Sequence, residues 1–230
     1  MTTALNGSAT GRVAIVTGGS RGVGQATVNR LATCGYAVVI NYLHSQRAAE
    51  SAVDAVLAGG GDAVAIRADA ADDLDVHRLF AETTAAFGGV DAVVHAAGSR
   101  VTATPVAKAS LDEFDALMRI NARATFVVNR EAARHLRRGG AIVNLSGSAE
   151  GPSLRTHGLY AAATGCTDGL TRALAMELRE RDITVNAVSF DVHRPCEPSR
   201  VAGLIAYLLS DRGRRLTGQV LRASDPWLPR

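Results

Sequence analysis

Residues 12–24 read Arg-Val-Ala-Ile-Val-Thr-Gly-Gly-Ser-Arg-Gly-Val-Gly, and this stretch decides the fold. Its first part is apolar and β-branched, which is typical of a buried strand. Gly18, Gly22 and Gly24 follow at once, and a helical pattern follows them. Glycines at such a place let the chain turn tightly and bring backbone N–H groups against a pyrophosphate at the helix N-terminus. The stretch therefore predicts a dinucleotide site.

Short apolar runs alternate with amphipathic stretches along the rest of the chain. The expected strands are 13–16, 37–41, 63–67, 92–95, 141–145, 184–188 and 219–223. The expected helices are 23–34, 46–58, 73–87, 111–136, 159–179 and 199–210. This alternation predicts an α/β, doubly wound Rossmann fold, with a mostly parallel sheet of about seven strands flanked by helices.

Composition narrows the class of protein. The net charge is +3, but the basic residues are dispersed and no aromatic residues interleave with them, so we expect no nucleic-acid partner. No apolar run reaches the roughly 18–20 residues of a membrane span, and residues 1–10 lack the features of a secretory signal. Cys34, Cys166 and Cys196 are too widely spaced for a disulfide framework or a metal site. We therefore expect a cytoplasmic protein without a membrane partner or a bound metal.

The end of the second expected strand indicates which nicotinamide cofactor binds. Proteins that bind NAD usually place an acidic residue there to hold the free ribose hydroxyl. This sequence has Asn-Tyr-Leu-His-Ser at 41–45 and no acid, while Arg21 in the glycine turn offers a cation. Both features favour a 2′-phosphate and hence NADP(H), although Asn41 has the alternative role of capping the strand end.

We expect residues 1–10 to be a disordered leader and residues 11–230 to be a single Rossmann-type NADP(H)-binding domain.

Several separate motifs resemble the short-chain dehydrogenase/reductase family, and in particular its 3-oxoacyl-carrier-protein reductases. The resemblance covers about residues 11–225. The matching segments are Thr17–Gly24, Asp69-Ala70, His95-Ala96-Ala97-Gly98, Asn121, Tyr160, Ile183–Val188 and Leu216–Val220. These segments, together with the residues at the end of the second expected strand, imply a set of cofactor-binding residues: Gly18, Ser20, Arg21, Gly22, Val23, Gly24, Asn41, Ser45, Asp69, Ala70, Ala96 and Gly98.

The catalytic end departs from the family pattern. The family uses Tyr-x-x-x-Lys, in which the tyrosine moves the substrate proton and the lysine holds the nicotinamide ribose and lowers the pKa of the tyrosine. Such a lysine ~5 Å away at an effective dielectric of ~20 contributes roughly 3 kcal/mol. Here Tyr160 is followed four residues later by Thr164, which can hydrogen-bond a ribose but carries no charge.

The family serine has no unambiguous counterpart. Counting 13 residues back from Tyr160 reaches Gly147, with Ser146 and Ser148 on either side. A loop shortened by one residue brings Ser148 into register, and Gly151 favours that alignment. Ser146, or no serine at all, is the alternative.

A third departure follows the strand at 184–188. The family has a lid of roughly 30 residues there, whereas in this chain only the ten residues 189–198 precede the next expected helix. A short connection leaves the pocket open to a large or carrier-bound substrate. His157, His193, His95 and Arg155 are candidates for replacement chemistry, of which we select His157; the alternative is local hydrogen bonding.

The resemblance implies three candidate functions. The first is an NADPH-dependent ketoreductase, in which NADPH delivers hydride to a ketone or enone, Tyr160 or a nearby water protonates the oxygen, and Asn121 holds a water relay. His157 and Thr164 are the further catalytic candidates. The second is a non-redox biosynthetic enzyme, such as a cyclase, dehydratase or isomerase. The third is a catalytically inactive cofactor-binding partner protein. The family's long central helices also imply a homodimer or homotetramer built through 111–136 and 159–179.

Overall fold

Strand β1 (Val13–Thr17) lies inside the sheet and carries the glycine turn at its carboxyl end. All five of its residues are buried, because helices cover both faces of a parallel sheet. The strand order is β3-β2-β1-β4-β5-β6-β7, and every neighbouring pair is parallel. The computed structural model describes residues 11–98, 103–148, 155–191 and 196–223. The chain changes direction across the sheet at β1, which makes the crevice between β1 and β4 the expected ligand site.

The other elements alternate as the sequence predicts, so the predicted fold class is confirmed. The remaining strands are β2 (Ala37–Tyr42), β3 (Ala63–Arg67), β4 (Val90–His95), β5 (Leu136–Ser148), β6 (Thr184–Asp191) and β7 (Val220–Arg222). The helices are α1 (Gly22–Thr33), α2 (Gln46–Ala58), α3 (Asp73–Phe87), α4 (Leu111–Met118), α5 (Ala124–His135), α6 (Gly158–Glu177) and α7 (Pro198–Leu208). Residues 1–10, the expected leader, lie outside the described residues.

The helix predicted over 111–136 is interrupted. Between α4 and α5 the chain forms a π-helical turn over Arg119–Arg123. A π turn inserts one extra residue into a helix. The spacing of apolar residues is compatible with such an insertion, so the sequence pattern does not predict it. Strand β5 also starts earlier than predicted, because Leu136 pairs with Val90 of β4 before the main ladder begins.

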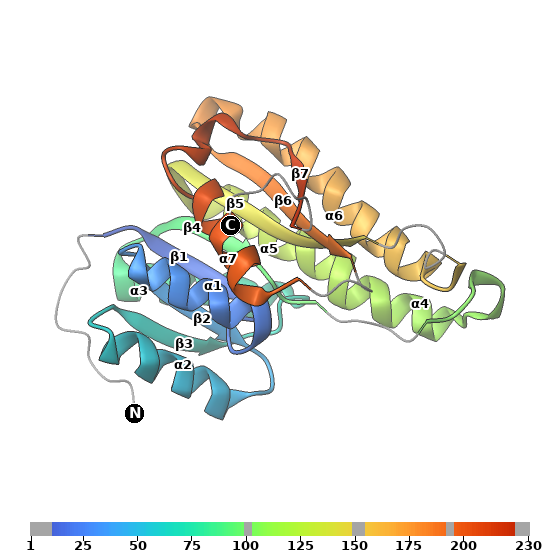
Figure 1. The fold of residues 1–230 in the computed structure, drawn as a ribbon, viewed down its shortest axis with the longest axis horizontal. Helices are drawn as coiled ribbons and strands as arrows, with labels where there is room; N and C mark the ends of the chain where they lie inside the picture. The colour runs from blue at the N-terminus through green and yellow to red at the C-terminus, as the bar shows by residue number, and fades with distance from the viewer. Residues whose placement is uncertain (1–10, 99–102, 149–154, 192–195, 224–230) are drawn as a thin grey trace.

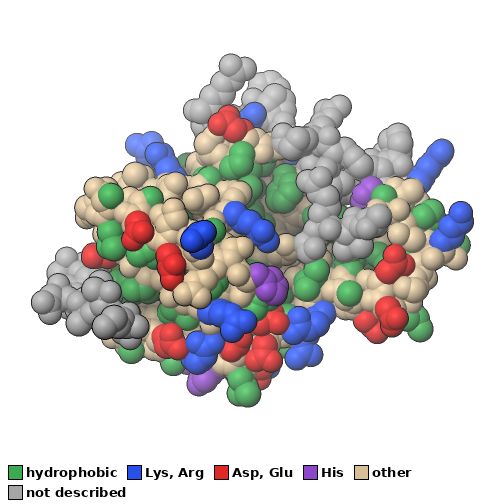
Figure 2. All heavy atoms as spheres, turned by 90° about the horizontal axis from the view of Figure 1, so that it is seen from below, with side chains coloured by type: hydrophobic (Ala, Val, Ile, Leu, Met, Phe, Trp, Pro, Cys, Tyr) green, Lys and Arg blue, Asp and Glu red, His purple; other side chains and the backbone are tan. Residues whose placement is uncertain are grey.

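Two apolar layers hold the sheet between the helices. One layer packs β1 residues such as Val13 and Ile15 against α3, α5 and α6, and the other packs Ala14 and Val16 against α1, α2 and α7 (Figure 1). Burying each Val or Ile side chain contributes about 1.5–3 kcal/mol. On the face that Figure 2 presents, basic and acidic side chains are interspersed. Within the described residues, no helix is long and apolar enough to cross a membrane.

Candidate functional site

The glycine turn is packed so closely that side chains are excluded from it. A Cβ on Gly24 would lie 2.2 Å from the carbonyl oxygen of Gly18, and Gly18 itself has a φ of +63°. A Cβ on Gly22 would instead meet nothing within 4 Å, and a φ of +55° favours glycine there. Gly19 N–H donates to Asn41 O at 3.1 Å, which fixes the turn against β2. The open backbone at the start of α1 is the geometry that a pyrophosphate requires.

The expected ribose ligands divide into two groups. Arg21 is exposed at the N-cap of α1, and Ser45 is the N-cap of α2 without a side-chain capping bond. Asn41 is only 2% exposed, and its Nδ2 donates to Ala68 O at 2.9 Å and to Ile66 O at 3.3 Å. The Asn41 amide thus ties β2 to the chain after β3, as its alternative role of strand-end cap predicts.

Asp69 is held in place by two partners. Its Oδ1 accepts from Ala71 N–H at 2.9 Å, and its Oδ2 accepts from the Arg119 guanidinium at 2.7 Å. Partial burial acts to raise the pKa of Asp69, but these two donors outweigh it and hold the pKa below its usual value. The ionised carboxylate beside Ala70 can accept a hydrogen bond from the amino group of an adenine. Arg119 belongs to the π turn, so that turn also positions the Asp69 carboxylate.

Thr17, at the end of β1, organises the loop after β4. Its Oγ1 accepts from Ala96 N–H and Ala97 N–H, both at 3.1 Å, so its own hydroxyl proton is directed at His95 Nδ1, 2.9 Å away. His95 is therefore neutral with its proton on Nε2, which has no hydrogen-bond partner among the described residues. Burial lowers the pKa of His95 to about 4. A neutral, 1% exposed imidazole here supports the loop carrying Ala96 and Gly98.

Because His95 stays neutral in the fold and takes up a proton when unfolded, acid destabilises the protein. Its contribution to stability is lost as the pH falls from about 6.5 toward the folded pKa of about 4. We expect wild type to lose about 2 kcal/mol more than His95→Asn between pH 7.5 and pH 5. Urea unfolding of both proteins at the two pH values measures this difference. Equal losses in the two proteins would disprove the assignment.

Asn121 lies in the middle of the π turn, next to Gly98 in the loop after β4, which is expected to contact the cofactor and is called the cofactor loop. Its Nδ2 donates to Leu117 O at 3.0 Å, and a Cβ on Gly98 would lie 3.1 Å from its Oδ1. Its backbone carbonyl accepts from Thr125 Oγ1 at 2.7 Å, and Thr125 in turn contacts Thr167 of α6 at 3.2 Å. Asn121 therefore joins the cofactor loop to the helix that carries Tyr160.

The structure places Gly147 directly against Tyr160. A Cβ on Gly147 would lie 1.9 Å from the phenolic oxygen, so the tyrosine occupies the space that a side chain at this position would need. Ser146 is buried, and its Oγ has no hydrogen-bond partner among the described residues. Ser148 pairs through its backbone with Asp191 of β6. The described residue that lies directly against the Tyr160 phenol is thus Gly147. The catalytic role of Ser148 stays a prediction.

Thr164 and His157 flank Tyr160 on α6. Thr164 is buried, and its hydroxyl donates to Tyr160 O at 3.0 Å, within its own helix. His157 is the N-cap of α6, and its Nδ1 lies 3.1 Å from Thr156 Oγ1. The hydroxyl of Thr164 cannot supply the charge that a lysine brings to this position. Residues 192–195, which include His193, lie outside the described residues.

Sequence reasoning missed a buried polar network beneath the site. Asn129 and Asn144 exchange two side-chain hydrogen bonds, at 2.8 and 3.1 Å, and Asn144 also donates to Thr171 at 3.0 Å. Each residue is unremarkable in sequence, and the one available signal was Asn144 inside an otherwise apolar strand. Because each amide is satisfied, the network fixes α5 and α6 relative to β5.

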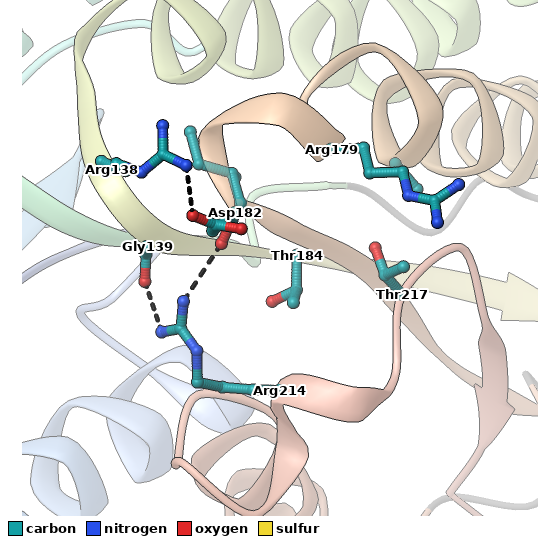
Figure 3. A pocket seen from close by; sticks show the side chains of 9 residues that line it. Arg138, Gly139, Arg179, Asp182, Thr184, Arg214 and Thr217 are labelled. Carbon is teal, nitrogen blue, oxygen red and sulfur yellow. Dashed lines mark hydrogen bonds and ion pairs between the residues drawn. The ribbon is translucent and has the colours of Figure 1, made fainter.

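A pocket of about 550 Å³, drawn in Figure 3, lies at the opposite end of the sheet from Tyr160. Its arginines hold the backbone together: Arg214 donates to Gly139 O at 2.6 Å and to Asp182 O at 3.1 Å, and Arg138 pairs with the Asp182 carboxylate at 2.7 Å. Since Gly139 and Thr184 lie near the amino ends of their strands, this pocket is remote from Tyr160.

Comparison with known proteins agrees with this geometry. A family model described as enoyl-(acyl carrier protein) reductase matches residues 18–192. Versicolorin reductase 1 of Aspergillus parasiticus is 41% identical over 180 residues, covering 78% of this chain and 68% of that protein. Hydroxynaphthalene reductase-like protein Arp2 of Metarhizium robertsii is 38% identical over 183 residues, covering 79% and 68%.

Solved structures are similar over nearly the whole chain. A short-chain dehydrogenase/reductase of Serratia marcescens has a TM-score of 0.87 at 32% identity, covering 94% of this chain and 97% of that one. A short-chain dehydrogenase of Burkholderia cenocepacia, solved in complex with NADP, has a TM-score of 0.85 at 33% identity with the same coverage. The chain therefore belongs to the short-chain dehydrogenase/reductase family.

Proposed function

We propose that this protein is an NADPH-dependent reductase of ketoreductase type, acting on a carbonyl of a fused-ring aromatic compound. The observation that carries the proposal is the phenol of Tyr160, which lies against Gly147 at the carboxyl edge of the sheet. That edge also holds the glycine turn and the Gly98–Asn121 contact. The relatives that are named as reductases, one of them for a hydroxynaphthalene, support this substrate class.

The residues of the cofactor end fit NADP(H). The open space at Gly22 leaves room for a pyrophosphate, and Arg21 is an exposed cation beside it. The described end of β2 carries no carboxylate. A carboxylate there would repel a 2′-phosphate, so this end of the strand suits NADP(H). Asp69, kept ionised by Arg119, suits the adenine amino group. When bound, NADPH supplies the hydride for the reduction.

The protein's part in the chemistry is to place the carbonyl and to supply a proton. Tyr160 donates from its phenolic oxygen to the carbonyl oxygen as negative charge develops there. Asn121 holds the cofactor loop against α6, which keeps the reacting groups in register. Thr164 supplies no cation, so the proton transfer depends on the phenol and on the neighbouring polar groups, of which His157 is the proposed assistant.

A spectrophotometric assay tests this proposal. We expect the protein to oxidise NADPH with 1-tetralone, a fused-ring ketone, and to form one alcohol for each NADPH consumed. Arg21→Ala should raise the KM for NADPH about 10- to 100-fold and leave the KM for NADH unchanged, because only the charge-assisted contact to the 2′-phosphate is lost. Tight NADPH binding without turnover of 1-tetralone, cyclohexenone or a 3-oxoacyl thioester would contradict the proposal. Product formation without NADPH consumption would establish the non-redox alternative.

We also propose that the protein is cytoplasmic and forms a homodimer or homotetramer. Large apolar side chains are exposed on the three helices expected to form the interface: Leu111 and Phe114 on α4, Phe126 on α5, and Met176 on α6. Sedimentation equilibrium of wild type and of Phe126→Glu would show whether these helices form the interface.

A further inference from the structure

Three side chains that can ligate a metal meet on the outside of the α3–α5 pair, away from Tyr160. Glu131 and His135 lie one turn apart on α5, which places them on the same side of the helix, and His77 approaches from α3. Glu131 Oε2 lies 3.3 Å from His77 Nδ1 and 3.2 Å from His135 Nε2. One ligand atom from each residue falls within 4.8 Å of the other two.

Glu131 is an unusual residue for this position. Its side chain is only 1% exposed, whereas both histidines are well exposed to solvent. Burying a carboxylate is costly unless it is paired. Its Oε1 accepts from Arg134 at 2.7 Å, while among the described contacts Oε2 faces the two imidazole nitrogens alone. The two carboxylate oxygens are thus differently engaged, and Oε2 is the one that can serve a further cation.

The distances suit a zinc-sized ion. Zn²⁺ binds imidazole nitrogen and carboxylate oxygen at about 2.0–2.2 Å with tetrahedral geometry. Two ligand atoms on such an ion lie about 3.3–3.5 Å apart, as these bond lengths and the tetrahedral angle require. The observed separations of 3.2 and 3.3 Å are close to this value. The histidine rings lie edge to face, with centroids 6.2 Å apart, and one ligand nitrogen of each ring lies within 4.8 Å of that of the other.

We propose that His77 Nδ1, His135 Nε2 and Glu131 Oε2 form a binding site for a divalent transition metal, with Zn²⁺ the best match. Two nitrogens and one oxygen are a donor set that zinc accepts readily. The exposed histidine edges leave the fourth position to water. Arg134 remains on Oε1 and holds the carboxylate in orientation, as outer partners of metal ligands commonly do. The ion ties α3 to α5 and stabilises that pair of helices.

Metal titration of the full-length, tag-free protein tests the proposal. Isothermal calorimetry should show one Zn²⁺ per chain, and His77→Ala and His135→Ala should each weaken binding at least 50-fold. Both histidines are exposed, so these variants retain the fold. His44→Ala, which removes an exposed histidine elsewhere on the surface, is the matched control and should bind zinc as wild type does. Added Zn²⁺ should raise the Tm of wild type and of His44→Ala but not that of the other two variants.

A second measurement identifies the ligands directly. Co²⁺ in place of Zn²⁺ should give visible absorption bands of a four-coordinate site in wild type, and these should be absent from the His77→Ala, His135→Ala double variant. Zinc binding that is equal in the double variant and in wild type would overturn the proposal. Absence of stoichiometric binding in wild type would overturn it too, leaving the cluster as a set of ion pairs only. Neither readout depends on reductase activity.

Discussion

Replacing Tyr160 by phenylalanine is expected to lower kcat/KM for NADPH-dependent carbonyl reduction by about 100- to 10,000-fold. That range is the usual contribution of a positioned acid or base. The variant removes one oxygen atom and keeps the ring that packs against Gly147, so the fold and the cofactor turn should be unaffected. The Kd for NADPH, measured by fluorescence, should therefore stay within about twofold of wild type, and the loss should fall on the chemical step.

Tyr207→Phe is the matched control, because Tyr207 is exposed on α7 and lies in no part of the proposed site. Its kcat/KM should equal that of wild type. A loss below about tenfold in Tyr160→Phe would contradict the proposed role of the phenol. Such a result would indicate that another group transfers the proton, and His157 would be the first to be tested.

Gly24→Ala is expected to weaken NADPH binding at least 100-fold and to destabilise the protein by about 1–3 kcal/mol. The added Cβ would lie 2.2 Å from Gly18 O and 2.8 Å from Gly18 C, both of which are backbone atoms that cannot rotate away. The turn must open to relieve this overlap, and overpacking of this kind typically costs about 1–3 kcal/mol. The displaced N–H groups then no longer converge on the pyrophosphate.

The control for this prediction is another glycine in a helix. A Cβ on Gly203 of α7 meets nothing within 4 Å, so Gly203→Ala should leave NADPH binding unchanged and stabilise the protein by about 0.5–1 kcal/mol. Calorimetric titration with NADPH and urea unfolding of the three proteins measure both effects. Normal NADPH affinity in Gly24→Ala would show that the turn does not hold the cofactor as proposed.

The catalytic end shows where counting along the sequence leaves alternatives open. The choice among Ser146, Gly147 and Ser148 depends on a shift of one residue, and such a shift changes which residue faces a neighbour. The structure puts Gly147 beside the phenol because β5 remains paired with β6 as far as Ser148. The role of Ser148 remains a prediction, which the Tyr160→Phe and Tyr207→Phe variants do not test.

The cofactor end was more predictable, with one exception. The glycine turn is a local feature, and its glycines are required wherever the backbone must turn tightly and come close to a pyrophosphate. Asn41 was assigned to the ribose from its position at the end of β2, and its amide is bonded to Ile66 O of β3 and to Ala68 O just after β3. The direction of a side chain at a strand end depends on which strand lies next to it, and that partner is about 25 residues away in sequence.

By itself, the sequence determined the alternation of strands and helices, the parallel sheet and the cofactor turn. These follow from apolar spacing and from glycine chemistry, which act over a few residues. Tertiary structure alone decided the π turn that carries Asn121, the neutral state of buried His95, the contact of Tyr160 with Gly147 and the meeting of His77 with Glu131. Each of these depends on side chains far apart in the chain, and only the packing of whole helices against the sheet brings them within reach.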